Sequence, residues 1–434
     1  DDKGTLEGWL NNRDRHRSAV AGSKTGLHLT DKMALHNPKK LTQQITKPFS
    51  ASTISSLRDG GDIITSRSGI IRLQTAHLMR MAGEKEDLRS MEGNDMTRPA
   101  NQPPSPHLEH VVTRQTDDTE LTKALGNIDG STAAVGIAPK LLKVACTTTW
   151  KEWRQLSNRQ KRHNEKTAKA MKEIGRKYKQ GKEIDQECVK VRPERALTLL
   201  RWIVNLSMEC RDLAEIDKHI VITGLPKGEG QVHSLDMMRP ISVGPIVGRL
   251  INHIVARRLS TAIVEHNLMD GAQYAFLPGR SIHGAIAAVL ECFKNSKRAR
   301  NGGPGRACHA VFYDISKAYD TIKWSAIQRA LIRIGAPGNL IDFVIRSLEG
   351  TRVRMKSGEP GRLTPEVQLH RAIKQGCPLA PLLFTIVMDE LHEGYRKIGG
   401  YALGKDVVVS SRGYCDDTVI FAEDIATLTK MHDL

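Results

Sequence analysis

Aromatic side chains and long apolar runs are scarce in this sequence. Phe, Trp and Tyr together make up 4% of the 434 residues, which argues against nucleic acid binding through rows of aromatic stacking platforms. No apolar stretch reaches the roughly 20 residues that a membrane-spanning helix needs. We therefore expect neither a membrane segment nor a secretory leader, and hence an intracellular protein.

Paired cysteines and zinc motifs are also missing. The seven cysteines are dispersed without a Cys-x-x-Cys pair, and the 16 histidines include no His-Glu-x-x-His motif. An odd, scattered set of thiols is typical of a reducing compartment. The pattern argues against both a disulfide framework and a zinc site.

Acidic residues are outnumbered by basic ones. Lys and Arg total 65 against 48 Asp and Glu, which gives a formal net charge of +17. Such a surface attracts a polyanion and releases its counterions, so nucleic acid is the expected partner. A dense basic run between Lys151 and Lys182 favours a helix that either contacts nucleic acid or is simply solvated.

Acidic residues stand at the ends of apolar segments near the C-terminus. Asp416 and Asp417 lie between runs 406–410 and 418–422, whose β-branched residues predict the two strands of a hairpin. Alternation along these strands would leave the pair at the hairpin tip, near Asp314 on a neighbouring strand. An Asp-Asp pair alone is more typical of a structural turn, so its context decides the interpretation.

Three carboxylates from two strands are what two divalent cations need at a nucleotide-joining centre. Chain extension is an in-line attack of a 3′-hydroxyl on an α-phosphate, and two metal ions roughly 4 Å apart stabilise both the attacking and the leaving oxygen. Mg²⁺ binds through a few carboxylates and substrate phosphates. The pattern predicts a nucleic acid polymerase with Asp314, Asp416 and Asp417 as catalytic residues.

Further segments surround these carboxylates in a fixed order. They are LPK (225–227), MRPIS (238–242), QYAFLPGRS (273–281), FYDISKAYD (312–320) and QGCPLAPLLF (375–384). Together with YCDD (414–417), they resemble the core motifs of reverse transcriptases, and most closely those of non-LTR (LINE-type) retrotransposons.

The resemblance implies roles at the metal site. Asp314, Asp416 and Asp417 match aspartates that hold two Mg²⁺ ions, for which Mn²⁺ could substitute, and the backbone carbonyl of Ile315 is implied as a further ligand. Cys415 stands where the family has a small residue. We interpret it as such, because sulfur is a poor ligand for Mg²⁺.

Substrate-binding positions are implied as well. Tyr319 matches the aromatic residue that packs under the incoming sugar and discriminates against a 2′-hydroxyl, although an aromatic residue after a strand is also typical of a core. Gln375 and Gly376 match the segment that lines the incoming nucleotide. Lys227 and Arg239 match cations that hold its triphosphate, and Lys227 could equally be a solvated surface charge.

The implied fold is α+β, the fingers and palm of a right-hand polymerase, with helices packed on one face of a small antiparallel palm sheet. We expect a polar extension and linker over 1–110, a fingers-like region over 111–306 and a palm over 307–434, without a thumb after the hairpin. Helices are predicted around 68–81, 322–334 and 379–398, the last two ended by glycine.

The main hypothesis is therefore an RNA-directed DNA polymerase that adds deoxynucleotides to a primer 3′-hydroxyl. The implied partners are an RNA template, a DNA primer, their RNA/DNA hybrid and deoxynucleoside triphosphates, and the family implies action in the nucleus. Two alternatives stay open. One is a truncated retroelement remnant that binds nucleic acid without catalysis, and the other is an intron maturase or RNA-templated RNA polymerase with a related palm.

Overall fold

The computed structural model describes residues 56–59, 62–83, 103–128, 142, 146, 193–226, 234–235, 238–300, 306–357, 362–404 and 406–434. The basic run at 151–182 lies outside these residues. Among the described residues, no helix is long and apolar enough to cross a membrane.

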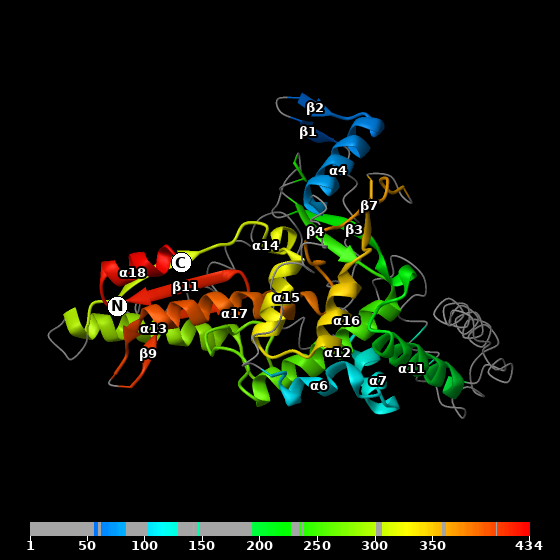
Figure 1. The fold of residues 1–434 in the computed structure, drawn as a ribbon. Coiled ribbons are helices and arrows are strands. Elements are labelled where there is room, and N and C mark those ends of the chain that lie inside the picture. The colour runs from blue at the N-terminus through cyan, green and yellow to red at the C-terminus, as the bar shows by residue number, and fades with distance from the viewer. Residues whose placement is uncertain are drawn as a thin grey trace, which may run out of the picture. The chain divides into compact units, whose positions relative to one another are not determined.

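The elements within these residues are shown in Figure 1. The helices are α4 (Arg67–Ala82), α6 (Pro106–Thr113), α7 (Asp118–Asn127), α11 (Pro193–Glu209), α12 (Ile246–Glu265), α13 (Ile282–Arg300), α14 (Ala318–Thr321), α15 (Trp324–Arg333), α16 (Gly338–Leu348), α17 (Ala380–Ile398) and α18 (Ile425–His432), with a 3₁₀ turn η2 (Glu215–Lys218). The strands are β1 (Leu57–Asp59), β2 (Asp62–Ile64), β3 (His219–Pro226), β4 (Met238–Val243), β5 (His309–Tyr313), β6 (Arg352–Met355), β7 (Val367–Gln368), β8 (Tyr401–Ala402), β9 (Val408–Val409), β10 (Ser411–Tyr414) and β11 (Asp417–Ala422).

The strand that follows the acidic pair lies at the centre of a three-stranded sheet. β11 pairs antiparallel with β10 on one side and with β5 on the other. Its residues Val419, Ile420 and Phe421 are buried, and such β-branched and aromatic residues suit a strand that is covered on both faces. The predicted small antiparallel sheet is confirmed.

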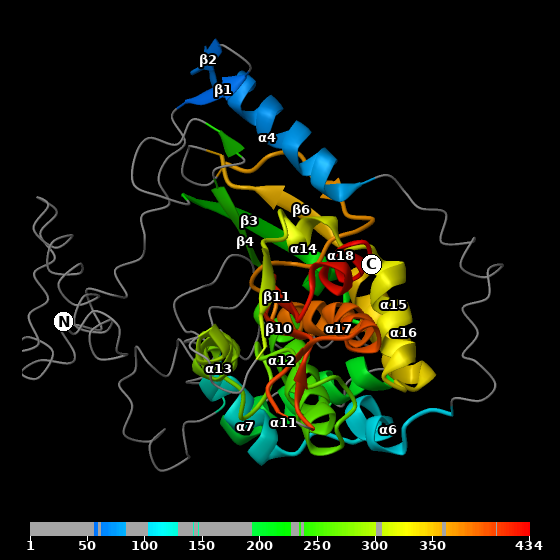
Figure 2. The same cartoon turned by 90° about the vertical axis from the view of Figure 1, so that its left-hand side faces the viewer.

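Both faces of β11 are covered. Phe421 packs with Cys292 of α13, whereas Ile420 packs with Tyr395 of α17 and Met431 of α18. Figure 2 shows α13 and α17 on opposite sides of β10 and β11. The prediction of helices on one face is wrong, because consecutive apolar residues in a strand point to opposite faces and each face needs a cover.

The first strand of the acidic hairpin begins later than predicted. The prediction placed it at 406–410, but β10 begins at Ser411, and Val408–Val409 forms β9, which pairs with β8. Ser411 and Gly413 have low β propensity, so the pattern favoured the β-branched residues before them. Pairing with β11 outweighs that local preference.

A second sheet has the strand order β4-β3-β6-β7. β3 pairs antiparallel with β4 and parallel with β6. The predicted helix around 68–81 is confirmed as α4, which packs along β6 and β7 (Figure 2). Its Leu78 is fully buried in the main core, so a segment that precedes the predicted linker contributes to that core. The domain boundaries themselves stay a prediction.

Helical spacing of apolar residues accounts for the neighbouring helices. In α15, Trp324, Ile327 and Leu331 are buried on one side. The helix predicted over 322–334 begins only at Trp324, because Ile322 is extended and ends the separate short helix α14. The helix predicted over 379–398 is confirmed as α17, which ends at Gly399.

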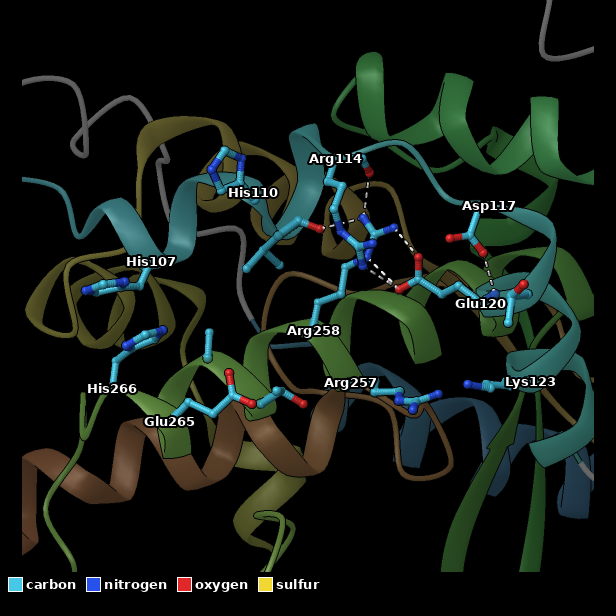
Figure 3. A pocket seen from close by; sticks show the side chains of 14 residues that line it. His107, His110, Arg114, Asp117, Glu120, Lys123, Arg257, Arg258, Glu265 and His266 are labelled. Atoms are coloured by element: carbon cyan, nitrogen blue, oxygen red, sulfur yellow. Dashed lines mark hydrogen bonds and ion pairs between the residues drawn. The ribbon is translucent and has the colours of Figure 1, made fainter.

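A buried ion pair joins α7 to α12 (Figure 3). The side chain of Arg258, 6% exposed, donates to the two carboxylate oxygens of Glu120 at 2.8 and 2.6 Å and to the carbonyls of Val111 and Arg114 at 3.0 and 2.7 Å. These residues line a pocket of about 430 Å³. Burial raises the pKa of Glu120, but the hydrogen bond and positive charge of Arg258 outweigh burial and leave that pKa below its ordinary value of 4.5.

We expect Glu120→Gln to make the free energy of unfolding depend less on pH in the acid range. Because folding lowers the pKa of Glu120, the pair stabilises the folded chain above the unfolded pKa, and this contribution is lost as pH falls through the lowered value. Urea unfolding at a series of pH values measures the free energy of unfolding. Below pH 4.5, the free energy of unfolding should fall more steeply for the unmodified chain than for the variant, and parallel curves would contradict the coupling.

Candidate active site

A two-residue loop carries the first residue of the acidic pair. Tyr414 of β10 is paired with Asp417 of β11, so the loop consists of Cys415 and Asp416. Cys415 has a φ of 61°, a left-handed conformation of the kind that two-residue hairpin loops require. In a non-glycine residue it costs of order 1–3 kcal/mol. The loop places Asp416 and Asp417 at one end of the three-stranded sheet.

Strand pairing brings Asp314 to the same end of that sheet. Tyr313, the last residue of β5, is paired with Thr418 of β11, so Asp314 follows beside the start of β11. Burial raises the pKa of Asp417, and the negative charges of Asp416 and Asp314 raise it further. Asp314 and Asp416 therefore lie near enough to Asp417 to disfavour its ionisation.

A cavity of about 670 Å³ lies beside these carboxylates. Its wall contains most of the residues predicted for the site, from β4, the segment after β5, α14, the turn before α17 and the hairpin loop: Arg239, Asp314, Ile315, Tyr319, Gln375, Gly376 and Asp416. Asp417 is not part of the wall. Lys227 lies outside the described residues.

The Gln375–Gly376 turn is fixed against β4. The backbone N–H of Ser242 donates to the carbonyl of Gln375 at 2.6 Å, and Gly376 has a φ of +107°. A Cβ atom at Gly376 would lie 2.6 Å from the carbonyl oxygen of Ser242. Only glycine fits this conformation and this close approach. The exposed Arg239, on the same strand β4, belongs to the same wall.

Tyr319 connects the hairpin loop to α17. Its ring stacks on that of Phe384, with centroids 5.3 Å apart and planes 13° apart. Its hydroxyl lies 3.4 Å from Sγ of Cys415, and burial raises the pKa of Tyr319. Burial also raises the pKa of the Cys415 thiol to about 11, so this thiol is neutral at physiological pH.

The donor atoms of the cavity suit a hard cation. Among the described residues, no group of three or more His, Cys, Asp or Glu residues is arranged to hold a metal ion by itself. Asp314 and Asp416 nevertheless line one cavity, together with Ile315. Carboxylate and carbonyl oxygens are the ligands that Mg²⁺ prefers, and water and substrate phosphates usually complete its coordination. Repulsion among the aspartates is also what a divalent charge would relieve.

His77 and Lys317 are among the residues of the wall that received no role from the sequence. His77 lies on α4, and no sequence pattern indicates that α4 reaches this cavity. Lys317 belongs to the motif 312–320 and has a φ of 54° before α14, a backbone conformation that the sequence does not reveal.

The same part of the chain matches a known family. Residues 225–433 match the family model described as reverse transcriptase (RNA-dependent DNA polymerase). A retrovirus-related Pol polyprotein from the type-1 retrotransposable element R2 of Popillia japonica is 32% identical over 169 residues, which are 39% of this chain and 22% of that protein. The corresponding protein of the type-2 element R2DM of Drosophila melanogaster is 30% identical over 221 residues, 51% of this chain and 20% of that protein.

The chain spans about a fifth of the length of these two relatives. A solved structure of apo telomerase from Candida tropicalis, truncated from its C-terminal domain, has a TM-score of 0.37 at 10% identity and covers 80% of this chain and 76% of that chain.

The family match includes Asp314, Asp416 and Asp417. Residues 225–433 are therefore a reverse transcriptase domain. Their relatives place this domain with the reverse transcriptases of non-LTR retrotransposons, which confirms the resemblance of the motifs.

We expect Gly376→Ala to destabilise the chain and to distort the cavity wall. The added Cβ would meet a backbone oxygen of β4 that cannot turn away, and the positive φ would add strain. Gly338→Ala is the matched control, because nothing lies within 4 Å of a Cβ at Gly338. Thermal unfolding should show that the free energy of unfolding of Gly376→Ala is lower by roughly 2 kcal/mol or more. The free energy of unfolding of the control should not fall. Equal melting temperatures for the two variants would contradict this account.

Proposed function

We propose that this chain is part of an RNA-directed DNA polymerase of a non-LTR retrotransposon, and that it adds deoxynucleotides to a primer 3′-hydroxyl. The observation that carries the proposal is the presence of Asp314 and Asp416 in the wall of one cavity that also contains Arg239 and Gln375. A volume of about 670 Å³ is in the usual range for ligand pockets. Carboxylates and a guanidinium in the wall of one cavity suit a metal-bound triphosphate.

The aspartates would hold the metal ions of the reaction. Asp314, Asp416 and Asp417 would bind two Mg²⁺ ions, or Mn²⁺ in their place, with the carbonyl of Ile315 as a further ligand. When bound, such ions supply positive charge at the attacking and leaving oxygens of the phosphoryl transfer. The sheet contributes preorganisation, because the carboxylates are held near one another before any cation arrives.

The remaining residues of the wall would position the nucleotide. Arg239, and Lys227 with it, would bind the triphosphate, where fixed positive charge stabilises the developing phosphoryl charge. Gln375 and Gly376 would line the nucleotide through a turn whose backbone is fixed against β4. Tyr319, held by its stacking on Phe384, would lie under the sugar and exclude a 2′-hydroxyl.

The wider assignments belong to the same proposal. Residues 307–434, with the three-stranded sheet, would be the palm, and residues 111–306 the fingers. An RNA template, a DNA primer and their hybrid would bind through the excess of positive charge, +17 over the whole chain. Deoxynucleoside triphosphates are the proposed substrates, and action in the nucleus would follow from the family.

We expect Asp416→Asn to abolish primer extension. The substitution keeps the size of the side chain but removes one negative charge from the group that would bind the cations. The assay is extension of a DNA primer on an RNA template with Mg²⁺ and deoxynucleotides, and the loss should be at least about 100-fold. Asp342→Asn, which changes an exposed aspartate of α16 paired with Arg211, is the control and should extend normally.

Different failures have different meanings in this assay. If neither the unmodified chain nor Asp416→Asn extends the primer, yet both bind it, a nucleic-acid-binding remnant becomes the better description. If Asp416→Asn extends as well as the unmodified chain, the hairpin loop does not carry the reaction.

We expect Tyr319→Ala to relax the selection of the sugar. Removal of the ring would open space for a 2′-hydroxyl, and the use of ribonucleotides relative to deoxynucleotides should rise by about tenfold or more. Tyr319→Phe is the matched control, because it keeps the stacking on Phe384 and loses only the contact with Cys415. Equal selectivity in all three proteins would remove Tyr319 from the sugar site.

A further inference from the structure

Gln273 is fully buried and lies against the hairpin loop. The backbone N–H of Cys415 donates to Oε1 of Gln273 at 3.0 Å, and Nε2 of Gln273 donates to the carbonyl of Cys415 at 3.3 Å. One carboxamide therefore binds both backbone polar groups of the residue that precedes Asp416. Among side chains, only Gln and Asn pair an amide donor with a carbonyl acceptor in this way.

The carboxamide is itself held in place. The backbone N–H groups of Tyr274 and Ala275 also donate to Oε1, at 3.1 and 3.2 Å. Arg280 donates to the carbonyl of Gln273 at 2.6 Å. The side chain is thus preorganised for the loop, because its rotation would break several hydrogen bonds at once.

The backbone around Gln273 meets β10 at an isolated β-bridge. Gln273 forms a parallel bridge with Gly413. The N–H of Gly413 donates to the carbonyl of Ala272 at 3.0 Å, and the N–H of Tyr274 donates to the carbonyl of Gly413 at 2.9 Å. A Cβ atom at Gly413 would lie 3.0 Å from Nε2 of Gln273, so the glycine permits this close approach.

The backbone just before Gln273 is tied to α17. The N–H of Asp270 donates to Oδ1 of Asp389 at 2.8 Å, and Arg396 donates to the carboxylate of Asp270 at 2.7 Å. Asp389 is fully buried and also accepts a hydrogen bond from Arg333 of α15. Helices α15 and α17 therefore set the position of Gln273. Through Gln273 they also set the position of the loop formed by Cys415 and Asp416.

We propose that Gln273 is a positioning residue of the polymerase reaction, which keeps Cys415 in its left-handed conformation and thereby presents Asp416 to the cavity. This inference rests on the proposed function. A non-glycine residue keeps a positive φ only where its surroundings enforce it. Without the carboxamide, the loop can relax and the carboxylate of Asp416 moves relative to Asp314.

The test compares two buried glutamines in the full 434-residue chain. Gln273→Met keeps the length of the side chain and removes both hydrogen bonds to Cys415. Gln74→Met is the matched control, because Gln74 is also fully buried and its Nε2 donates to the carbonyl of Lys356 at 3.1 Å. Three quantities are measured: the melting temperature, Mn²⁺ binding by electron paramagnetic resonance, and the kcat and KM for a deoxynucleotide in primer extension.

Gln273→Met should lower kcat by about 10- to 100-fold, since small misplacements of a reacting group have effects of that size. It should raise the Mn²⁺ concentration at half-saturation and leave KM nearly unchanged, because Arg239 and Gln375 stay in place. Gln74→Met should lower only the melting temperature. A Gln273→Met protein that differs from the unmodified chain in melting temperature alone would overturn the inference.

Three further outcomes are informative. If the unmodified chain binds Mn²⁺ but extends no primer, the proposed function fails, and Mn²⁺ affinity still decides the role of Gln273: weaker binding in Gln273→Met supports it and equal binding overturns it. If the unmodified chain binds no Mn²⁺, both proposals fall. If Gln273→Met does not fold, Gln273→Glu carries the test, because it retains the acceptor for Cys415 and loses the donor. A folded Gln273→Glu with normal kcat would overturn the inference.

Discussion

Carboxylates that lie together repel one another, and the site depends on the strand pairing that holds them in place. β11 is paired on both sides, with β5 and with β10, so Asp314, Asp416 and Asp417 reach one end of a sheet whose central strand is buried on both faces. The pKa of Asp417 is raised by burial and by the other two aspartates. Folding thus stabilises an arrangement that is electrostatically unfavourable in isolation, and the proposed binding of divalent cations depends on that arrangement.

Backbone conformations that most residues avoid surround the same cavity. Cys415 and Lys317 have φ values of 61° and 54°, and Gly376 has a φ of +107°. At Cys415 and Lys317 this conformation costs free energy, because neither residue is glycine, whereas Gly376 adopts it without that cost. Gln273 binds the backbone of Cys415, and Ser242 binds the turn before Gly376. The site is therefore assembled from short segments that the surrounding sheet edges hold in shape.

Buried polar side chains link these segments to the helices. Asp389 of α17 joins Arg333 of α15 to the backbone of Asp270. On the same helix, His392 lies 2.8 Å from the hydroxyl of Ser411 in β10, and burial lowers its pKa to about 4. A neutral histidine beside the hairpin adds no charge to the aspartates at the tip. These hydrogen bonds between buried polar groups join α15, α17 and β10 to the segment that contains Asp270.

The sequence by itself determined the antiparallel sheet and helices α4 and α17, because these follow from turn chemistry and from periodicities of two and 3.6 residues. The acidic residues and the order of the motifs were indicated by their resemblance to reverse transcriptases. The tertiary structure decided what local pattern cannot express. In the tertiary structure β10 lies at Ser411–Tyr414 despite weak β propensity, and both faces of β11 are covered. His77 reaches the cavity, and Gln273 lies against Cys415. Each of these depends on contacts between residues far apart in the chain, whose free energy outweighs the preferences of neighbours in sequence.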